Sequence, residues 1–181
     1  MNLSQEFLQQ SRDYCSYYRY LGEKALAQIT DEQLFSLPAT ESNSIAIIVK
    51  HLAGNMKARW TDVFISDGEK AQRNRDEEFI TDDDTPETIR ALWHEGWNIF
   101  FTALDSFQEE DLTRIITIRQ EPHTIMRAIM RQMTHYSYHV GQIVYLAKLH
   151  ANESWISLSI PRGGSAQFVE KAPIMPHRTP H

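Results

Sequence analysis

Two histidines near the end of the sequence have the spacing of metal ligands on a helix. His135 and His139 are four residues apart in the segment His-Tyr-Ser-Tyr-His-Val-Gly-Gln, which ends at Gln142. On an α-helix, residues four apart share one face and lie about 40° apart around the axis. Imidazole nitrogens are common ligands of divalent transition metals. The segment therefore predicts two ligands of one metal ion.

A third histidine, His51, could complete this site from another helix. It lies in a helix predicted over residues 44–65, where it and Asn55 flank the apolar face. The histidine pair flanks the apolar face of the last predicted helix in the same way, and Arg131 and Gln142 extend that polar stripe. Two polar flanks on neighbouring helices are what a partly open pocket between helices requires.

The histidine pattern alone leaves other interpretations open. A single histidine beside an apolar face is more often a core residue, and pairs four apart also occur on solvated helix faces. The zinc-protease motif is absent, because it needs a glutamate directly after the first histidine and Tyr136 stands there. The other five histidines are not expected to be ligands; they are His94, His123, His150, His177 and His181.

The elements that must position these residues are four long helices. Helical periodicity predicts them over residues 2–29, 44–65, 85–107 and 123–150. Four such helices around one core specify an all-α protein, an up-down four-helix bundle. Bundles of this class build metal sites from side chains on facing helices.

The connections between these helices can also be predicted. Gly68 is expected to cap the second helix, before a long polar loop over residues 69–84. Residues 112–119 are rich in β-branched side chains, which favours a short extended connection or a small hairpin. An irregular C-terminal strap is expected after the last helix, with a mobile tail at about 165–181. Gly141 is expected to allow close approach of two helices.

Composition and charge narrow the class of protein. The 181 residues, 41% hydrophobic and 23% charged, are expected to form one domain over residues 1–181. The formal net charge of −6 argues against binding to nucleic acid or to an anionic membrane. No apolar run of about 20 residues and no secretion signal is visible. The single cysteine, Cys15, fits a reducing compartment, so a cytoplasmic location is expected.

The sequence resembles the DinB-like superfamily, also called the YfiT-like metalloenzymes, and within it an uncharacterised branch. This DinB is the damage-inducible bundle protein, not the polymerase of similar name. The resemblance rests on His-Leu-Ala-Gly-Asn at 51–55 and on the histidine pair with its following Gly-Gln, and it covers nearly the whole chain in helix order and spacing. Four further segments match the branch, at 59–62, 67–70, 73–79 and 157–161.

The resemblance implies a commonly homodimeric bundle that holds a divalent metal on His51, His135 and His139. Zinc or nickel would fit three imidazoles, and so would iron. Some members of the superfamily transfer low-molecular-weight thiols such as bacillithiol, or use mycothiol in an isomerisation. Others are described as metal-dependent hydrolases. A small-molecule substrate is therefore expected.

Three neutral imidazoles would leave the metal an open position, which is typical of catalytic sites. There, a water or a substrate thiol could lose its proton near neutral pH. Asn55 and Gln142 are candidates for hydrogen bonds to the ligands or the substrate. Four arginines could hold a carboxylate or phosphate, or could instead pair with nearby acids on the surface; they are Arg59, Arg73, Arg75 and Arg131.

Three functions remain open from the sequence. The first is a metal-dependent transferase that joins a low-molecular-weight thiol to an electrophilic small molecule. The second is a non-catalytic metal-binding module of a stress response, and the third is a hydrolase that uses metal-bound water. No carboxylate is evident as a general base, which favours the first function over the third.

Overall fold

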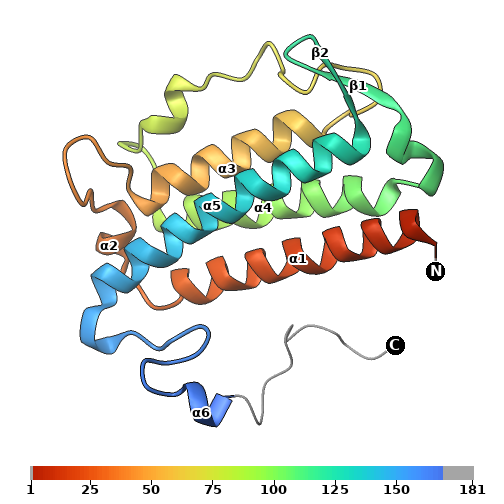
Figure 1. Ribbon diagram of the computed structural model, residues 1–181. Helices are drawn as coiled ribbons and strands as arrows, with labels where there is room; N and C mark the ends of the chain where they lie inside the picture. The colour runs from red at the N-terminus through yellow and green to blue at the C-terminus, as the bar shows by residue number, and fades with distance from the viewer. Residues whose placement is uncertain (1, 169–181) are drawn as a thin grey trace.

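Four long helices form an all-α bundle in the computed structural model, which describes residues 2–168 (Figure 1). They are α1 (Leu3–Leu26), α3 (Ile45–Trp60), α4 (Pro86–Ser106) and α5 (Ile125–Ala151). The predicted all-α helical bundle is confirmed. The shorter helical elements are α2 (Asp31–Phe35), η1 (Asp76–Phe79), η2 (Glu109–Thr113), η3 (Asn152–Ser154) and α6 (Ser165–Phe168).

Three of the long helices begin at a hydroxyl side chain that caps them. The hydroxyl oxygens of Ser44, Thr85 and Thr124 accept hydrogen bonds from backbone amides three residues later, at 3.3, 3.3 and 3.1 Å. Such bonds satisfy amides that have no partner within the first helical turn. Pro86 follows the cap of α4 and has no amide hydrogen to satisfy.

The predicted up-down order of helix directions is wrong in one respect, because α3 and α4 run the same way. A Cβ added to Gly96 would lie 3.0 Å from the Cα of Ala53, and further along both helices the rings of Trp60 and Phe100 are 5.3 Å apart. The loop over residues 61–85 returns the chain along the bundle, outside α3 (Figure 1). This loop can therefore place side chains beside the outer face of α3.

The second helix ends earlier than predicted. α3 stops at Trp60 instead of residue 65, and Asp62 adopts a positive φ of 51°. The predicted C-cap at Gly68 is also wrong, since the amide of Gly68 donates to the carbonyl of Thr117 at 2.8 Å. Gly68 thus ties the long loop to the segment before α5.

That segment is a hairpin, one of the two alternatives that the sequence left open. Strands β1 (Ile115–Ile118) and β2 (Glu121–Thr124) pair antiparallel. Its two-residue turn is Arg119–Gln120. His123, predicted at the start of the last helix, lies in β2 because α5 begins only at Ile125.

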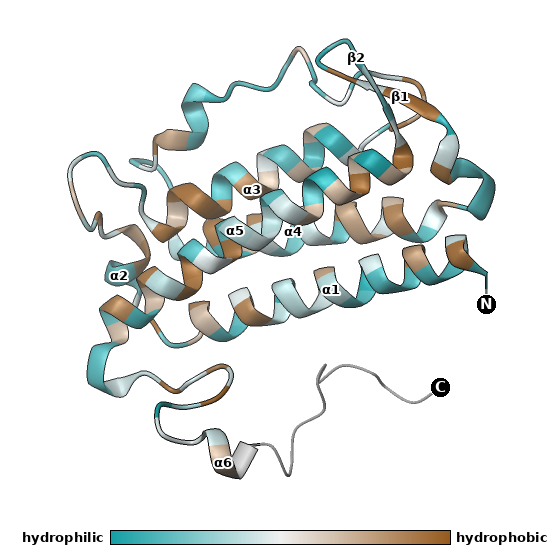
Figure 2. Ribbon diagram, viewed as in Figure 1, coloured by the Kyte–Doolittle hydropathy of each residue, from teal (hydrophilic) through white to brown (hydrophobic). Residues whose placement is uncertain are grey.

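The core lies between the amphipathic faces of the four long helices, along which hydrophobic and hydrophilic residues alternate (Figure 2). At its centre the Trp60 indole donates to the Tyr136 hydroxyl at 2.8 Å, and the Trp97 ring packs edge-on against Tyr136. Cys15 is fully buried, and burial raises the pKa of its thiol to about 12. The predicted core face of α5 is buried throughout; it comprises Ile125, Ile129, Gln132, Tyr136, Val140, Ile143 and Ala147.

Two remaining expectations concern a glycine and the tail. Gly141 does not mediate close helix approach, because a Cβ added there would meet nothing within 4 Å. Of the tail expected to be mobile, residues 165–168 form α6 and residues 169–181 lie outside the described part of the chain. Among the described helices, none has both the length and the apolar character needed to cross a membrane.

Candidate metal centre

The three histidines meet where α5 packs against α3. Nε2 of His51 lies 3.2 Å from Nε2 of His135, and one ring nitrogen of each of the three histidines falls within 4.8 Å of the others. Two nitrogens bound to one tetrahedral zinc at about 2.0–2.1 Å would be roughly 3.3 Å apart. The cluster could therefore hold a divalent metal, with His139 as the third ligand.

The hydrogen bonds of the histidine rings leave Nε2 of His51 and of His139 available to bind a metal. Nδ1 of His51 contacts Glu78 and Nδ1 of His139 contacts Gln142, so Nε2 is the remaining nitrogen of both rings. Nε2 of His139 is buried without a hydrogen-bond partner. A buried ring nitrogen without a partner is costly unless something occupies the space beside it. These residues fit a bound cation.

Both histidines of α5 are held in the neutral form that binds metals. Burial lowers the pKa of His135 to about 3, helped by the nearby charges of His139, His51 and Arg131. Burial also lowers the pKa of His139 to about 4, although the hydrogen bond between its Nδ1 and the accepting amide oxygen of Gln142 acts in the opposite direction. Near neutral pH, neither ring has to lose a proton before it binds a metal.

Glu78 from η1 in the long loop supports the ligand of α3. Its Oε2 accepts from Nδ1 of His51 at 3.0 Å, and its two oxygens accept from the guanidinium of Arg73 at 2.7 and 2.9 Å. A carboxylate on the distal nitrogen fixes the tautomer of a metal-binding histidine and raises its basicity. Gly54 makes room for it, because a Cβ there would lie 2.3 Å from Oε1 of Glu78.

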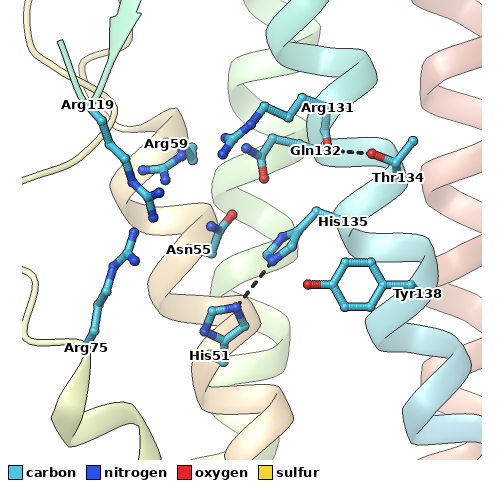
Figure 3. A pocket seen from close by; sticks show the side chains of 10 residues that line it. All are labelled: His51, Asn55, Arg59, Arg75, Arg119, Arg131, Gln132, Thr134, His135 and Tyr138. Atoms are coloured by element: carbon cyan, nitrogen blue, oxygen red, sulfur yellow. Dashed lines mark hydrogen bonds between the residues drawn. The ribbon is translucent and has the colours of Figure 1, made fainter. Parts of the chain in front are cut away.

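A pocket of about 200 Å³ opens beside His51 and His135 (Figure 3). Polar side chains dominate its wall. Four of them are arginines, which come from α3, the long loop, the hairpin and α5. The arginines are Arg59, Arg75, Arg119 and Arg131, and the other lining residues besides the two histidines are Asn55, Gln132, Thr134 and Tyr138.

Three of the four arginines share one carboxylate. Glu69 accepts from Arg59 at 3.1 Å and from Arg119 at 3.1 Å, and it also pairs with Arg75. Although burial opposes it, these bonds lower the pKa of Glu69 to about 2. Within residues 2–168, the guanidinium of Arg131 has neither a hydrogen bond nor an ion pair with a carboxylate.

The predicted site residues separate into two groups. Asn55 lines the pocket together with Arg59, Arg75 and Arg131. Gln142 reaches the metal cluster through His139 and does not line the pocket. Arg73 lies outside the pocket wall, because its guanidinium is bound to Glu78.

Sequence reasoning missed six side chains of this site, among them Thr134 and also Gln132, which it assigned to the core face of the last helix. Glu78 and Glu69 belong to a loop without periodicity, so no pattern reveals which acid faces which base. Arg119 lies in the turn of the hairpin, whose position could not be predicted from the sequence. Tyr138 was within reach, since it is three residues after His135 on the same helix; in Figure 3 its hydroxyl points toward the histidines.

Comparison with known proteins identifies the sequence family. Residues 2–164 match the family described as "Protein of unknown function (DUF1572)". The chain belongs to this family. No curated protein matches the sequence.

A solved structure with the same fold as this DUF1572 protein comes from Enterococcus faecalis. It is described as the conserved protein of locus from Enterococcus faecalis, and it superimposes with a TM-score of 0.61 at 18% sequence identity. The match covers 84% of this chain and 99% of the other. At that identity, the similarity supports the bundle fold alone.

Proposed function

We propose that this protein is a metal-dependent enzyme of the DinB-like superfamily that transfers a low-molecular-weight thiol of the bacillithiol type to a small electrophile. The observation that carries the proposal is the convergence of three imidazoles at the edge of a polar pocket. Structural metal sites are usually closed by four protein ligands, whereas catalytic sites keep a position open toward the substrate. A zinc, nickel or iron ion on these histidines would favour the deprotonated, nucleophilic form of a thiol.

Other side chains of the protein would orient the metal ligands and contact the leaving group. Glu78 holds the ring of His51 through Nδ1, and Gln142 holds the ring of His139 in the same way. The phenol of Tyr138 lines the pocket next to His135, where it could donate a hydrogen bond to the leaving group. The reaction forms a bond between the thiol sulfur and a carbon of the electrophile, and the leaving group departs with the electron pair of the bond that breaks.

One contact favours thiol transfer over hydrolysis. Many metal-dependent hydrolases use a carboxylate as general base, in addition to the metal, to take a proton from the attacking water. Glu78 is a carboxylate in contact with the histidine cluster, but its oxygens are engaged by His51 and Arg73. It supports a ligand and is poorly placed to act as a base.

The test is a conjugation assay with untagged protein loaded with one equivalent of zinc. A fluorogenic alkylating electrophile is supplied with cysteine, glutathione or bacillithiol, and conjugate formation is followed against the uncatalysed rate. The His135→Ala variant is the control. Thiol-dependent conjugation that exceeds this control supports the proposal, and equal rates with every thiol contradict it. A parallel panel of ester, amide and phosphate substrates would reveal a hydrolase instead.

We also propose that the protein is a homodimer. Large apolar side chains stay exposed on the outer face of α5, including Tyr145 at 69% and Leu149 at 55% exposure. Exposed apolar side chains grouped on one helix face often mark a contact between subunits. Light scattering during size-exclusion chromatography would give the mass directly, and a mass of one chain would contradict the dimer.

A further inference from the structure

The wall of one small pocket contains four arginines, although the protein is acidic overall. The formal net charge of the chain is −6, yet the pocket wall carries the guanidinium groups of Arg59, Arg75, Arg119 and Arg131. Each comes from a different part of the fold, so the fold itself assembles the cluster (Figure 3). Like charges held this close repel one another unless something negative offsets them.

The described residues offset only part of this charge. The carboxylate of Glu69 contacts three of the arginines, but one carboxylate neutralises one guanidinium. Arg131 faces the same pocket from α5 and has no carboxylate partner among residues 2–168. The cluster therefore keeps an excess of positive charge directed into the pocket.

We infer that this pocket is an anion subsite, in which Arg131 binds a carboxylate or phosphate group of a small substrate. A guanidinium offers a planar fork of donors that matches either oxyanion in bidentate fashion. The inference deepens the proposed function: it states that the thiol or the electrophile carries such a group, a short distance from its reacting atom.

A second side chain of the pocket wall has an unsatisfied polar atom. Gln132 is 1% exposed and lines the pocket, and its amide oxygen has no hydrogen-bond partner within the described residues. A buried amide oxygen needs a donor, which a water or a hydroxyl or amino group of the ligand can supply, whereas an ionised carboxylate has none to give. Asn55, also buried, adds a second amide to the same wall.

The size of the pocket limits the ligand to a small molecule. About 200 Å³ is below the usual range of roughly 300–1,000 Å³ for pockets that bury a drug-sized ligand. A nucleic acid would instead need an extended basic surface, which the net charge of −6 does not favour. The group enclosed there is thus a single carboxylate or phosphate, and not an extended polyanion.

The experiment measures anion binding by calorimetry at constant low chloride, first with metal-stripped protein, so that a metal cannot bind the anion. Succinate and inorganic phosphate are the probes, and uncharged succinamide is the reference. We expect saturable binding of at least one anion and none of succinamide. The tighter anion tells whether the natural group is a carboxylate or a phosphate.

Substitutions on α5 then locate the binding site. Arg131→Ala should weaken anion binding at least about tenfold, as expected for the loss of a charged hydrogen bond. The affinity of Arg131→Lys should lie between those of the wild type and Arg131→Ala. Arg127→Ala is the matched control, because Arg127 is an exposed arginine one turn earlier that does not line the pocket. Binding that is unchanged in Arg131→Ala, or weakened equally in Arg127→Ala, would overturn the inference. So would the absence of saturable binding of both anions to the wild type.

Failure of this inference is distinguishable from failure of the proposed function. Anion binding that depends on Arg131 without any thiol conjugation would overturn the transferase and keep the subsite. Conjugation that depends on His135, without anion binding, would overturn the subsite and keep the transferase. Melting curves of the Arg131 variants would verify folding, which an exposed position should preserve.

Discussion

Nδ1 of His51 lies 3.0 Å from Oε2 of Glu78, although the two residues belong to different elements, α3 and η1. The contact links the candidate metal centre to the long loop. Because Glu78 also binds Arg73, the orientation of a predicted ligand depends on the folding of a segment that has no regular secondary structure of its own apart from η1.

Metal analysis should find one equivalent in the wild-type protein when it is purified without chelators and without a nickel column. His51→Ala and His139→Ala should each remove most of it, because each substitution leaves only two imidazoles. His94→Ala is the control, since His94 is exposed on α4. Elemental analysis by mass spectrometry gives the ratio, and full occupancy in the His51 variant would remove that residue from the ligand set.

Glu78→Gln should weaken metal binding about 10–100-fold, the usual effect of losing a partner that orients a ligand. The glutamine can still accept from His51, but it loses the charge that pairs with Arg73. Glu77→Gln makes the same change of charge at the exposed neighbouring position. Competition with a chromophoric chelator measures both affinities, and equal values for the two variants would argue against a role for Glu78.

Gly54→Ala should separate stability from metal affinity. A methyl group at this position would lie 2.3 Å from Oε1 of Glu78, so the carboxylate must move away from His51. Alanine is also the better helix former by roughly 1 kcal/mol, so the free energy of unfolding should not fall much. We expect Gly54→Ala to lose metal to the competing chelator more readily than the wild type, with a nearly unchanged midpoint of urea unfolding.

Gly141→Ala is the control for that substitution, because a Cβ there meets nothing within 4 Å. It should raise the free energy of unfolding by about 0.5–1 kcal/mol and leave the metal affinity alone. A loss of metal in both glycine variants would indicate a general effect on the helices instead of a specific effect on Glu78.

Glu69→Gln should change how stability depends on pH. The folded state lowers the pKa of Glu69 from 4.5 to about 2, so its ionised form stabilises the protein above the ordinary pKa of the carboxyl group. That contribution is lost as the pH falls toward 2. The difference in unfolding free energy between wild type and variant should therefore be largest near neutral pH and shrink through this window.

Urea unfolding at several pH values tests this expectation, with Glu110→Gln as the control for removing one exposed carboxylate. At neutral pH the loss in Glu69→Gln should be on the order of 2 kcal/mol, because three arginines lose their shared partner. A difference that stays constant between neutral and acid pH would show that Glu69 is not ionised in the folded state.

The sequence predicted those parts of the molecule that follow from local periodicity. The apolar stripe of α5 and the start of α4, within one residue of the predicted position 85, are local signals, and both follow from the sequence. The histidines of α5 could be placed together for the same reason, because one helix sets their spacing. Their proximity to His51 needed the further assumption that α3 packs beside α5.

The loop could not be predicted in the same way, because contacts distant in sequence hold it. The carboxylate of Asp67 accepts from the backbone amides of Arg119 and Gln120 at 2.9 and 2.8 Å, across more than 50 residues. Glu69 depends on arginines from three elements. No short window of sequence contains Asp67 together with these amides, or Glu69 together with Arg119, so the loop acids could not be told apart before the fold was known.

Arg119 and Gln120 form the hairpin turn with positive φ angles of 56° and 63°. A positive φ costs a non-glycine residue about 1 kcal/mol or more of conformational free energy. Two-residue hairpin turns of this type therefore usually have the sequence Asn-Gly. Glycine would relieve this cost at both positions, although at position 119 it would also remove the hydrogen bond to Glu69. At position 120 that exchange is harmless to the pocket, but at position 119 it deletes a guanidinium that lines it. A screen of this protein for thermal stability should also measure ligand binding, because at position 119 the relief of backbone strain comes with the loss of a side chain that lines the pocket.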